Sequence, residues 1–167
     1  MTATDDLAER LRTHFPDVQL ARDEVTVIVP AEEIVASLEY LRSDTDLGFD
    51  FLSDLSATDW PDRVPRFWLA YQLYSVRHRH RMRVKVGLAE EEPRVDTVTG
   101  LYPTADWLER EVFDFFGVVF DGHPDLRRII MPDDWDGFPL RKDYSLGGVG
   151  TQYKGGAFIP PVDERGM

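Results

Sequence analysis

Residues 66–88 read RFWLAYQLYSVRHRHRMRVKVGL, and the two halves of this stretch have the composition of two neighbouring β-strands. Aromatic and branched side chains dominate the first half, and such side chains favour strands. In the second half a basic series alternates with a largely apolar one: Arg77, Arg79, Arg81, Arg83 and Lys85 against His78, His80, Met82, Val84 and Val86. A strand with this period has one basic face and one mostly apolar face. The pattern predicts a hairpin that reverses around 77–80 and carries Arg81, Arg83 and Lys85 on the outer face of its second strand.

The basic side of this hairpin has two interpretations. The cations are either the solvated side of a half-buried sheet, loosely paired with nearby acids, or a docking patch for another molecule; the first is the commoner case. His78 and His80 also suggest a metal site. No third ligand lies near them in the sequence, so a turn or surface position is favoured for both.

Strands and helices are also predicted upstream of the hairpin. Periodicity predicts a helix over 5–15 with Thr4 as its N-cap, strands over 18–20 and 25–29, and a helix from 31 to about 44. The segment FDFLSDLSATDW, 49–60, alternates Phe49, Phe51 and Leu55 with polar residues. This alternation predicts a strand with those three side chains on one face.

Downstream, a charged loop and a short strand lead into a helix that begins after Thr104 and ends at Gly117. From residue 121 the chain carries most of its glycines and few periodic apolar positions. The predicted fold is therefore α+β: a mixed or antiparallel sheet with flanking helices in a compact domain, residues 1–120, followed by an extended irregular C-terminal arm, residues 121–167. We expect the arm to order against partner surfaces.

Composition excludes several functions. The 167 residues contain no cysteine, so thiolate nucleophiles, disulfides and cysteine-ligated zinc or iron–sulfur clusters are excluded for these residues. The net charge of -12 disfavours whole-surface attraction to nucleic acid or anionic lipid. The apolar runs are far shorter than the roughly 20 residues that cross a bilayer, and the acidic N-terminal residues do not resemble a secretory signal, so we expect a cytosolic chain.

The helix after Thr104 carries an unusual set of charges. Its apolar stripe is predicted to consist of Leu108, Val112, Phe115 and Val119. The charged side consists of Glu109, Arg110, Glu111 and Asp114. Such a cluster could be a general acid/base pair, an internal network of salt bridges, or a surface offered to another protein.

The enzyme interpretation has little support. The only partner near the carboxylates is His123, beyond the turn at Asp121-Gly122. The sequence contains no nucleophile elbow, no P-loop and no dinucleotide fingerprint, and DDWDG at 133–137 lacks the glutamate of a calcium loop. We therefore expect no catalytic, cofactor-binding or metal-binding residue in this chain, and treat a small enzyme using Glu111 and His123 as the weaker alternative.

The segment GLYPTADWLEREVFDFFGVVFDGHPDLRRIIMPDDWDGFPLRKDYSL, residues 100–146, resembles the hallmark region of the 30 kDa-type subunit in the hydrophilic arm of respiratory complex I, often called its C subunit. The residues that match the family pattern are Glu109, Arg110, Glu111, Asp114, Phe115, Phe116, His123, Arg127, Ile129 and Ile130. The resemblance covers residues 45–146 well. It departs from many relatives at Ser145, where they have proline, and over 147–167.

The resemblance implies a non-redox scaffold subunit of a proton-pumping NADH:quinone oxidoreductase. Its expected partners are the D and B subunits, which hold the quinone site and the terminal cluster. FMN and iron–sulfur clusters belong to partner subunits, and NADH and quinone are substrates of the whole complex. The chain would lie peripherally on the cytoplasmic side of the membrane, associated with it only through the complex, and would bind no nucleic acid.

The resemblance also implies roles for individual residues. Glu109, Arg110, Glu111 and Asp114 are expected to fix the helix to the turn that follows it, with His123 just beyond, and to a neighbouring subunit, with Arg127 and Arg128 as counter-charges. Arg141, Lys142 and Asp143 are expected at the contact with the D subunit.

Two alternatives remain open. Similar subunits occur in membrane-bound hydrogenases and in complexes fed by reduced ferredoxin or a deazaflavin. A free-standing module that binds an acidic partner or nucleic acid through the hairpin is disfavoured by the acidity of the chain, and by the lack of aromatic residues between Arg79 and Lys85.

Overall fold

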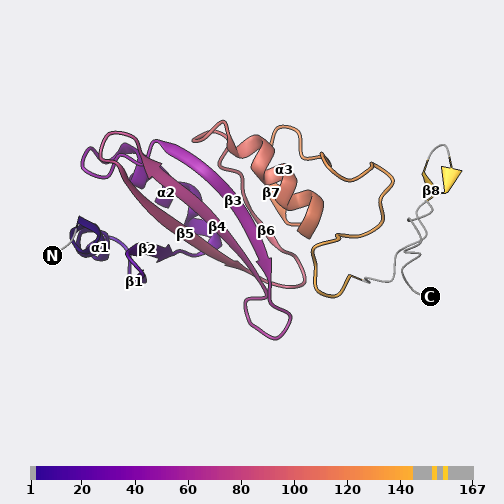
Figure 1. The fold of residues 1–167 in the computed structure, drawn as a ribbon, viewed down its shortest axis with the longest axis horizontal. Helices are drawn as coiled ribbons and strands as arrows, with labels where there is room; N and C mark the ends of the chain where they lie inside the picture. The colour runs from indigo at the N-terminus through magenta and orange to yellow at the C-terminus, as the bar shows by residue number, and fades with distance from the viewer. Residues whose placement is uncertain (1–2, 145–151, 154–155, 158–167) are drawn as a thin grey trace, which may run out of the picture.

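The computed structural model describes residues 3–144, 152–153 and 156–157. Its centre is a five-stranded sheet with strand order β1-β2-β5-β4-β3 (Figure 1). The strands are β1 (Val18–Ala21), β2 (Glu24–Ile28), β3 (Phe51–Asp59), β4 (Phe67–Ser75) and β5 (His80–Leu88). β2 and β5 are parallel and the other neighbours are antiparallel, so the sheet is mixed. The predicted α+β class is confirmed.

Short elements surround this sheet. The helices are α1 (Ala3–Arg12), a 3-10 turn η1 (Ala31–Glu33), α2 (Ile34–Ser43) and α3 (Ala105–Phe116). The remaining strands are β6 (Arg94–Asp96) with β7 (Val119–Asp121), which are parallel, and β8 (Gln152–Tyr153) with β9 (Gly156–Ala157), which are antiparallel. α3 and β7 lie beyond the β3 edge of the sheet, and residues 122–144 form an irregular arm beside α3 (Figure 1).

The hairpin that the sequence predicted is formed by β4 and β5. Its turn lies at 76–79, and Arg79 there has a positive φ of 55°. Alternation produces the two faces: Leu69, Tyr71, Val84 and Val86 are fully buried. The core cluster joins these side chains to apolar residues of α1, α2 and α3, so the three helices share one hydrophobic core on one face of the sheet.

Strand β3 departs from the predicted alternation. A β-bulge interrupts its pairing with β4 between Leu52 and Asp54, so the side chains before and after the bulge change faces. Leu52 and Leu55 are buried in the core, whereas Phe51 is 45% exposed on the other face. Phe51 and Leu55 therefore lie on opposite faces, so the predicted alternation of Phe49, Phe51 and Leu55 is wrong at the bulge.

Of the two predicted N-caps, Thr4 is wrong and Thr104 is confirmed in position only. Thr4 lies inside α1, which ends at Arg12 rather than at residue 15, and Thr13 there bonds its hydroxyl to the carbonyl of Arg10. Thr104 stands at the N-cap position of α3, but its side chain makes no capping hydrogen bond. It donates instead to the carbonyl of Leu52, at 3.2 Å, and so fastens the start of α3 to strand β3.

Candidate functional site

The predicted site residues lie on α3 and on the arm that follows it. Helix α3 ends at Gly117, as predicted, in the left-handed conformation with φ 71°. A Cβ at this position would meet the ring of Phe138 at 2.4 Å, so the close approach of the arm also requires glycine. The cap thus both ends α3 and gives the arm room to return across its C-terminus.

The buried stripe of α3 differs from the predicted one. Ala105, Glu109, Val112 and Phe116 are buried, whereas Leu108 and Phe115 are only partly buried and Val119 belongs to β7. The buried set has the same helical spacing as the predicted set but begins three residues earlier, at Ala105 instead of Leu108. This shift places the carboxylate of Glu109 inside the domain.

Asp114 is a fully buried carboxylate that binds the arm. Its Oδ2 accepts hydrogen bonds from the backbone N–H groups of Ile129, Ile130 and Met131 at 3.1, 2.7 and 2.9 Å. Its Oδ1 accepts one from Nη1 of Arg128 at 2.8 Å. Burial alone would raise the pKa of Asp114, but these hydrogen bonds outweigh burial and lower it. Asp114 is therefore held as a charged anchor.

Arg128 and other arm groups satisfy the C-terminal carbonyls of α3. Arg128 donates to the carbonyls of Asp114, Trp135 and Gly137. The carbonyl of Phe115 accepts the N–H of Leu140 at 3.2 Å, and that of Phe116 accepts Nε of Arg141 at 2.6 Å. Cations suit the negative end of the helix dipole, so the arm caps α3 both electrostatically and by hydrogen bonding.

Glu109 and His123 form a second buried group. Oε1 of Glu109 accepts the N–H of Val98 at 2.8 Å, and its Oε2 accepts the hydroxyl of Thr97. The side chain of His123 is also fully buried, with its Nε2 3.9 Å from Oε2 of Glu109. Nδ1 of His123 accepts the N–H of Asp125 at 3.0 Å, which leaves the ring proton on Nε2. Burial raises the pKa of Glu109 to about 7.

The raised pKa of Glu109 predicts a pH-dependent stability. Because the folded chain holds a proton that the unfolded chain releases above its ordinary pKa of 4.5, stability falls as pH rises from 4.5 to about 7. In Glu109→Gln this group no longer titrates. We expect the loss of unfolding free energy between pH 5 and pH 8 to be about 2–3 kcal/mol smaller in the variant. Urea titrations at both pH values measure this change. An equal loss of unfolding free energy between pH 5 and pH 8 in the two proteins would contradict the prediction.

The other predicted members of the α3 cluster have different surroundings. Arg110 is buried; its Nε donates to the carbonyl of Arg127 at 3.2 Å and its guanidinium lies 5.0 Å from the ring centre of Trp107. Arg127 pairs its own side chain with Asp125, at 2.8 Å, rather than with the acids of α3. Glu111 is exposed, and no ion pair joins it to His123 within the described residues.

A second anchor, which the sequence analysis missed, holds the far end of the arm. Arg66 is buried and forms a bidentate pair with buried Asp59, at 2.7 and 2.9 Å. The same guanidinium bonds Glu90 at 2.6 Å and Asp143 of the arm at 2.8 Å. Asp59 also accepts the N–H of Lys142 at 2.8 Å. Hydrogen bonding to Arg66 lowers the pKa of Asp59 and overcomes its burial.

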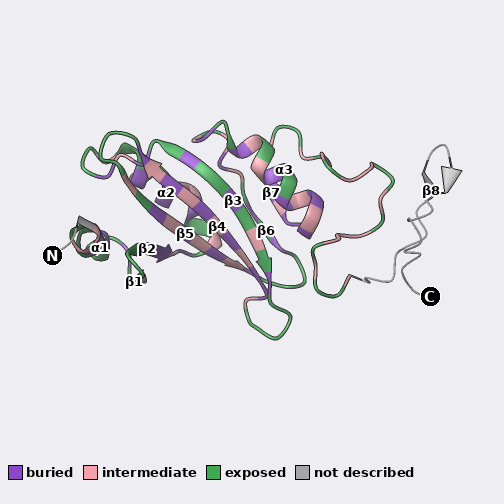
Figure 2. Ribbon diagram, viewed as in Figure 1, coloured by how far each residue is buried: buried purple, intermediate pink, exposed green. Residues whose placement is uncertain are grey.

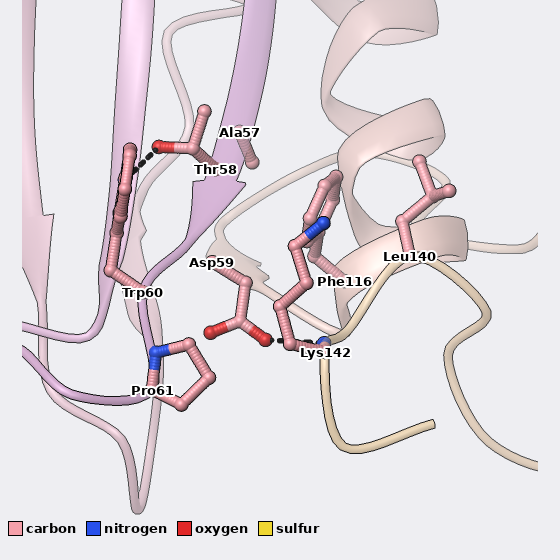
Figure 3. Close-up of a pocket in the computed structure, with 8 residues that line it drawn as sticks. All are labelled: Ala57, Thr58, Asp59, Trp60, Pro61, Phe116, Leu140 and Lys142. Atoms are coloured by element: carbon pink, nitrogen blue, oxygen red, sulfur yellow. Dashed lines mark hydrogen bonds between the residues drawn. The ribbon is translucent and has the colours of Figure 1, made fainter. Parts of the chain in front are cut away.

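Arg141, Lys142 and Asp143 thus all make hydrogen bonds within the chain. The guanidinium of Arg141 lies 4.9 Å from the ring centre of Phe67 and 4.7 Å from that of Phe138. Burial lowers its pKa. Lys142 bonds to Asp59 through its backbone N–H alone. Its exposed side chain lines a groove beside Asp59 and Trp60 (Figure 3).

The groove beside this anchor has a volume of about 450 Å³. Its lining comes from the end of β3, the end of α3 and the arm: Ala57, Thr58, Asp59, Trp60, Pro61, Phe116, Leu140 and Lys142 (Figure 3). Trp60 and Leu140 are 44% and 48% exposed. The arm therefore presents apolar side chains beside its ionic anchors.

The two histidines of the hairpin bond to backbone carbonyls. Nε2 of His78 lies 2.9 Å from the carbonyl oxygen of Thr45, and Nε2 of His80 lies 2.8 Å from that of Leu47. No group of three or more His, Cys, Asp or Glu side chains in the described part of the chain could hold a metal ion. In the same residues, no helix has the length and apolar character needed to cross a bilayer.

Known proteins with the same sequence pattern are respiratory subunits. The profile of a family described as "Respiratory-chain NADH dehydrogenase, 30 Kd subunit" matches residues 27–149. The C subunit of NADH-quinone oxidoreductase from Salinispora arenicola is 44% identical over 96% of this chain and 69% of that protein. The protein of the same name from Geotalea uraniireducens is 45% identical over 89% of this chain and 90% of its own length.

Solved structures agree with this assignment. The trypsin-resistant fragment (1-134) of Nqo5 has a TM-score of 0.64 and 33% identity, covering 75% of this chain and 100% of the fragment. A chain of the membrane-bound sulfane sulfur reductase, an archaeal respiratory membrane complex, has a TM-score of 0.76 and 26% identity, covering 87% of each chain. The resemblance of the hallmark segment is confirmed: the chain belongs to the family of the respiratory-chain NADH dehydrogenase 30 kDa subunit, which includes the C subunit of NADH-quinone oxidoreductase.

Proposed function

We propose that this chain is a non-redox scaffold subunit in the peripheral arm of a proton-pumping NADH:quinone oxidoreductase. It would help to assemble and hold the quinone-site D subunit and the terminal-cluster B subunit, on the cytoplasmic side of the membrane. Family membership supports the complex, and the lack of cysteine supports a chain without clusters of its own. FMN, iron–sulfur clusters, NADH and quinone would then be bound by other subunits.

The observation that carries the scaffold role is that α3 and the arm combine buried, internally bonded carboxylates with exposed apolar side chains. The carboxylates of Glu109 and Asp114 are buried and bonded within the chain. Next to them Trp107, Ile130 and Leu140 remain 62%, 57% and 48% exposed. Internal anchors of this kind hold exposed apolar side chains at fixed positions, and such side chains are the usual centres of protein interfaces.

Glu111→Ala tests this proposal because Glu111 is exposed in the chain by itself. We expect its free energy of unfolding to change by less than about 0.5 kcal/mol. In the complex, loss of a charge that meets a partner should reduce recovery of the assembled oxidoreductase at least about tenfold, which corresponds to about 1.4 kcal/mol. Membrane levels of the complex and the melting curve of the purified chain measure the two effects.

The matched control is Glu39→Ala, which removes an exposed acid from α2. It should leave both stability and assembly unchanged. Assembly of the Glu111→Ala complex at wild-type yield would mean that Glu111 is ordinary surface and does not meet another protein of the complex.

Purification of the tagged chain from gently solubilised membranes tests the proposal as a whole. Companions with flavin and iron–sulfur absorption and NADH:quinone activity are expected. Recovery of the chain alone and colourless from the soluble fraction would overturn the scaffold role. An equivalent subunit of a hydrogenase or of a ferredoxin- or deazaflavin-fed complex is the second candidate; the names of the Salinispora and Geotalea relatives favour the NADH-linked complex.

A further inference from the structure

One face of the five-stranded sheet has a composition unlike that of a solvated surface. The helices contribute to a single core on the opposite face. On β4 the side chains of Trp68, Ala70, Gln72 and Tyr74 are partly buried without belonging to that core, so β4 alternates between buried and intermediate along its length (Figure 2). The face that the helices leave open is therefore lined along β4 by partly buried side chains, which include Trp68 and Tyr74.

The strand register aligns these side chains in rows with cations of β5. Phe51, Tyr74 and Arg81 stand side by side across three strands, because Tyr74 pairs with both of the others. In the next row Gln72 lies between Asp54 and Arg83. The bulge in β3 contributes to this arrangement, since it brings the 45% exposed ring of Phe51 onto this face.

The two rows enclose a hollow of about 530 Å³. Its lining consists of Glu24, Phe51, Ser53, Asp54, Gln72, Leu73, Tyr74, Arg81 and Arg83. We call this surface, with Trp68 and Lys85 in the adjoining rows, the open sheet face. A hollow of this size takes several side chains of another protein, and aromatic residues with arginine are enriched in protein interfaces.

The charges on the open sheet face are incompletely neutralised. Arg83 pairs with Glu24 at 3.1 Å, and Nζ of Lys85 lies 4.9 Å from the ring centre of Trp68. Arg81 is exposed and has no carboxylate partner within 4.0 Å among the described residues. Arg77 and Arg79, in the hairpin turn just before β5, are also exposed. This concentration of cations stands out in a chain of net charge -12.

We propose that the open sheet face is a docking site for a neighbouring protein of the complex, whose contacting segment bears a carboxylate for Arg81 beside an apolar side chain for the hollow. This inference rests on the proposed membership of the complex and adds a second contact, separate from α3 and the arm. The guanidinium fork binds carboxylate in two parallel hydrogen bonds, and the row beside Arg81 offers apolar surface, with Tyr74 next to it and Phe51 beyond Tyr74. Arg83 is already paired, which leaves Arg81 as the specific attachment point.

The same charges disfavour a polyanion. Glu24 and Asp54 line the hollow itself and would face the phosphates of a nucleic acid or a lipid surface. The overall charge of -12 adds long-range repulsion to both. A protein segment of mixed charge can meet Arg81 with an acid and Asp54 with a donor, so it fits where a uniformly negative surface does not.

A single-cysteine cross-link tests the proposal, because the chain contains no cysteine of its own. Gln72→Cys places a thiol in the hollow, where a benzophenone maleimide can be attached; Ala36→Cys places one on exposed α2 as control. In membranes carrying the full complex, we expect illumination to join position 72 to an acid-containing segment of one other protein of the complex. Links to lipid, nucleic acid or a second copy of this chain would overturn the proposal, as would no link from a chain shown to be in the complex.

The variant Arg81→Glu adds an energetic test. We expect recovery of the complex to fall at least about tenfold, while the purified chain melts within a few degrees of the wild type. Arg12→Glu reverses an exposed arginine of α1 and should assemble normally. Reversing the cross-linked acid to lysine should restore assembly with Arg81→Glu. Normal assembly of Arg81→Glu would sink the inference, but leaves the scaffold role standing if Glu111→Ala still fails to assemble.

Discussion

Asp114→Ala is expected to lower the free energy of unfolding by about 3–5 kcal/mol, a large part of the stability of an ordinary domain. The substitution removes the acceptor of three backbone N–H groups and leaves the guanidinium of Arg128 without its carboxylate. A buried donor left without a partner loses its hydration and gains nothing in return, and a buried unpaired cation is costlier still. Urea unfolding of the purified chain measures the change.

A second expected result is that Asp114→Ala loosens the arm in particular. Since Asp114 holds the backbone at 129–131 and Arg128 reaches the carbonyls of Trp135 and Gly137, the arm should detach before the sheet unfolds. Trypsin should then cleave the variant after Arg127 or Arg128 under conditions in which the wild type resists. Glu111→Ala, which removes an exposed carboxylate from the same helix, is the matched control. Equal stability of the two variants would show that the buried network contributes no net stabilisation.

The local elements were predictable because each depends on residues close together in the sequence. The alternation at 80–88 specifies a strand with two different faces, and Gly117 can end a helix in a conformation that few other residues adopt. The parallel pairing of β2 with β5 has no such local signal, since it joins residues about 57 positions apart, as in Val25 and Met82. The bulge that moves Phe51 to the open face is likewise set by pairing with β4.

The candidate site was likewise predictable only where it depends on residues close together in the sequence. The acids and basic residues of 109–128 could be named from the hallmark segment, but their roles differ by burial: Asp114 is an internal anchor and Glu111 is exposed. Glu109 was placed on the charged side because the predicted apolar stripe began three residues too late, at Leu108 instead of Ala105. Arg66 and Asp59 belong to no sequence motif. They meet only because a hairpin brings the end of β3 beside the start of β4. The tail at 147–167 lies outside the described residues except for the backbone of β8 and β9.

Arg66→Leu is expected to cost about 3–5 kcal/mol of unfolding free energy, the second large effect in this chain. The variant leaves the buried carboxylate of Asp59 with only the N–H of Lys142, and it releases Glu90 and Asp143 from their shared cation. The arm should loosen at its far end, so trypsin should gain access after Lys142. Urea unfolding and limited proteolysis measure the two effects.

The exposed pair of Arg94 and Asp121 provides a control of the same chemistry. It is also bidentate, at 2.9 and 2.7 Å, but its side chains are 52% and 40% exposed. Water screens that pair, so Arg94→Leu should cost much less stability than Arg66→Leu. The double variant Asp59→Leu/Arg66→Leu should be more stable than Arg66→Leu alone, because no unpaired buried charge remains. If Arg66→Leu and Arg94→Leu lose equal stability, burial of the first pair is not what makes it an anchor.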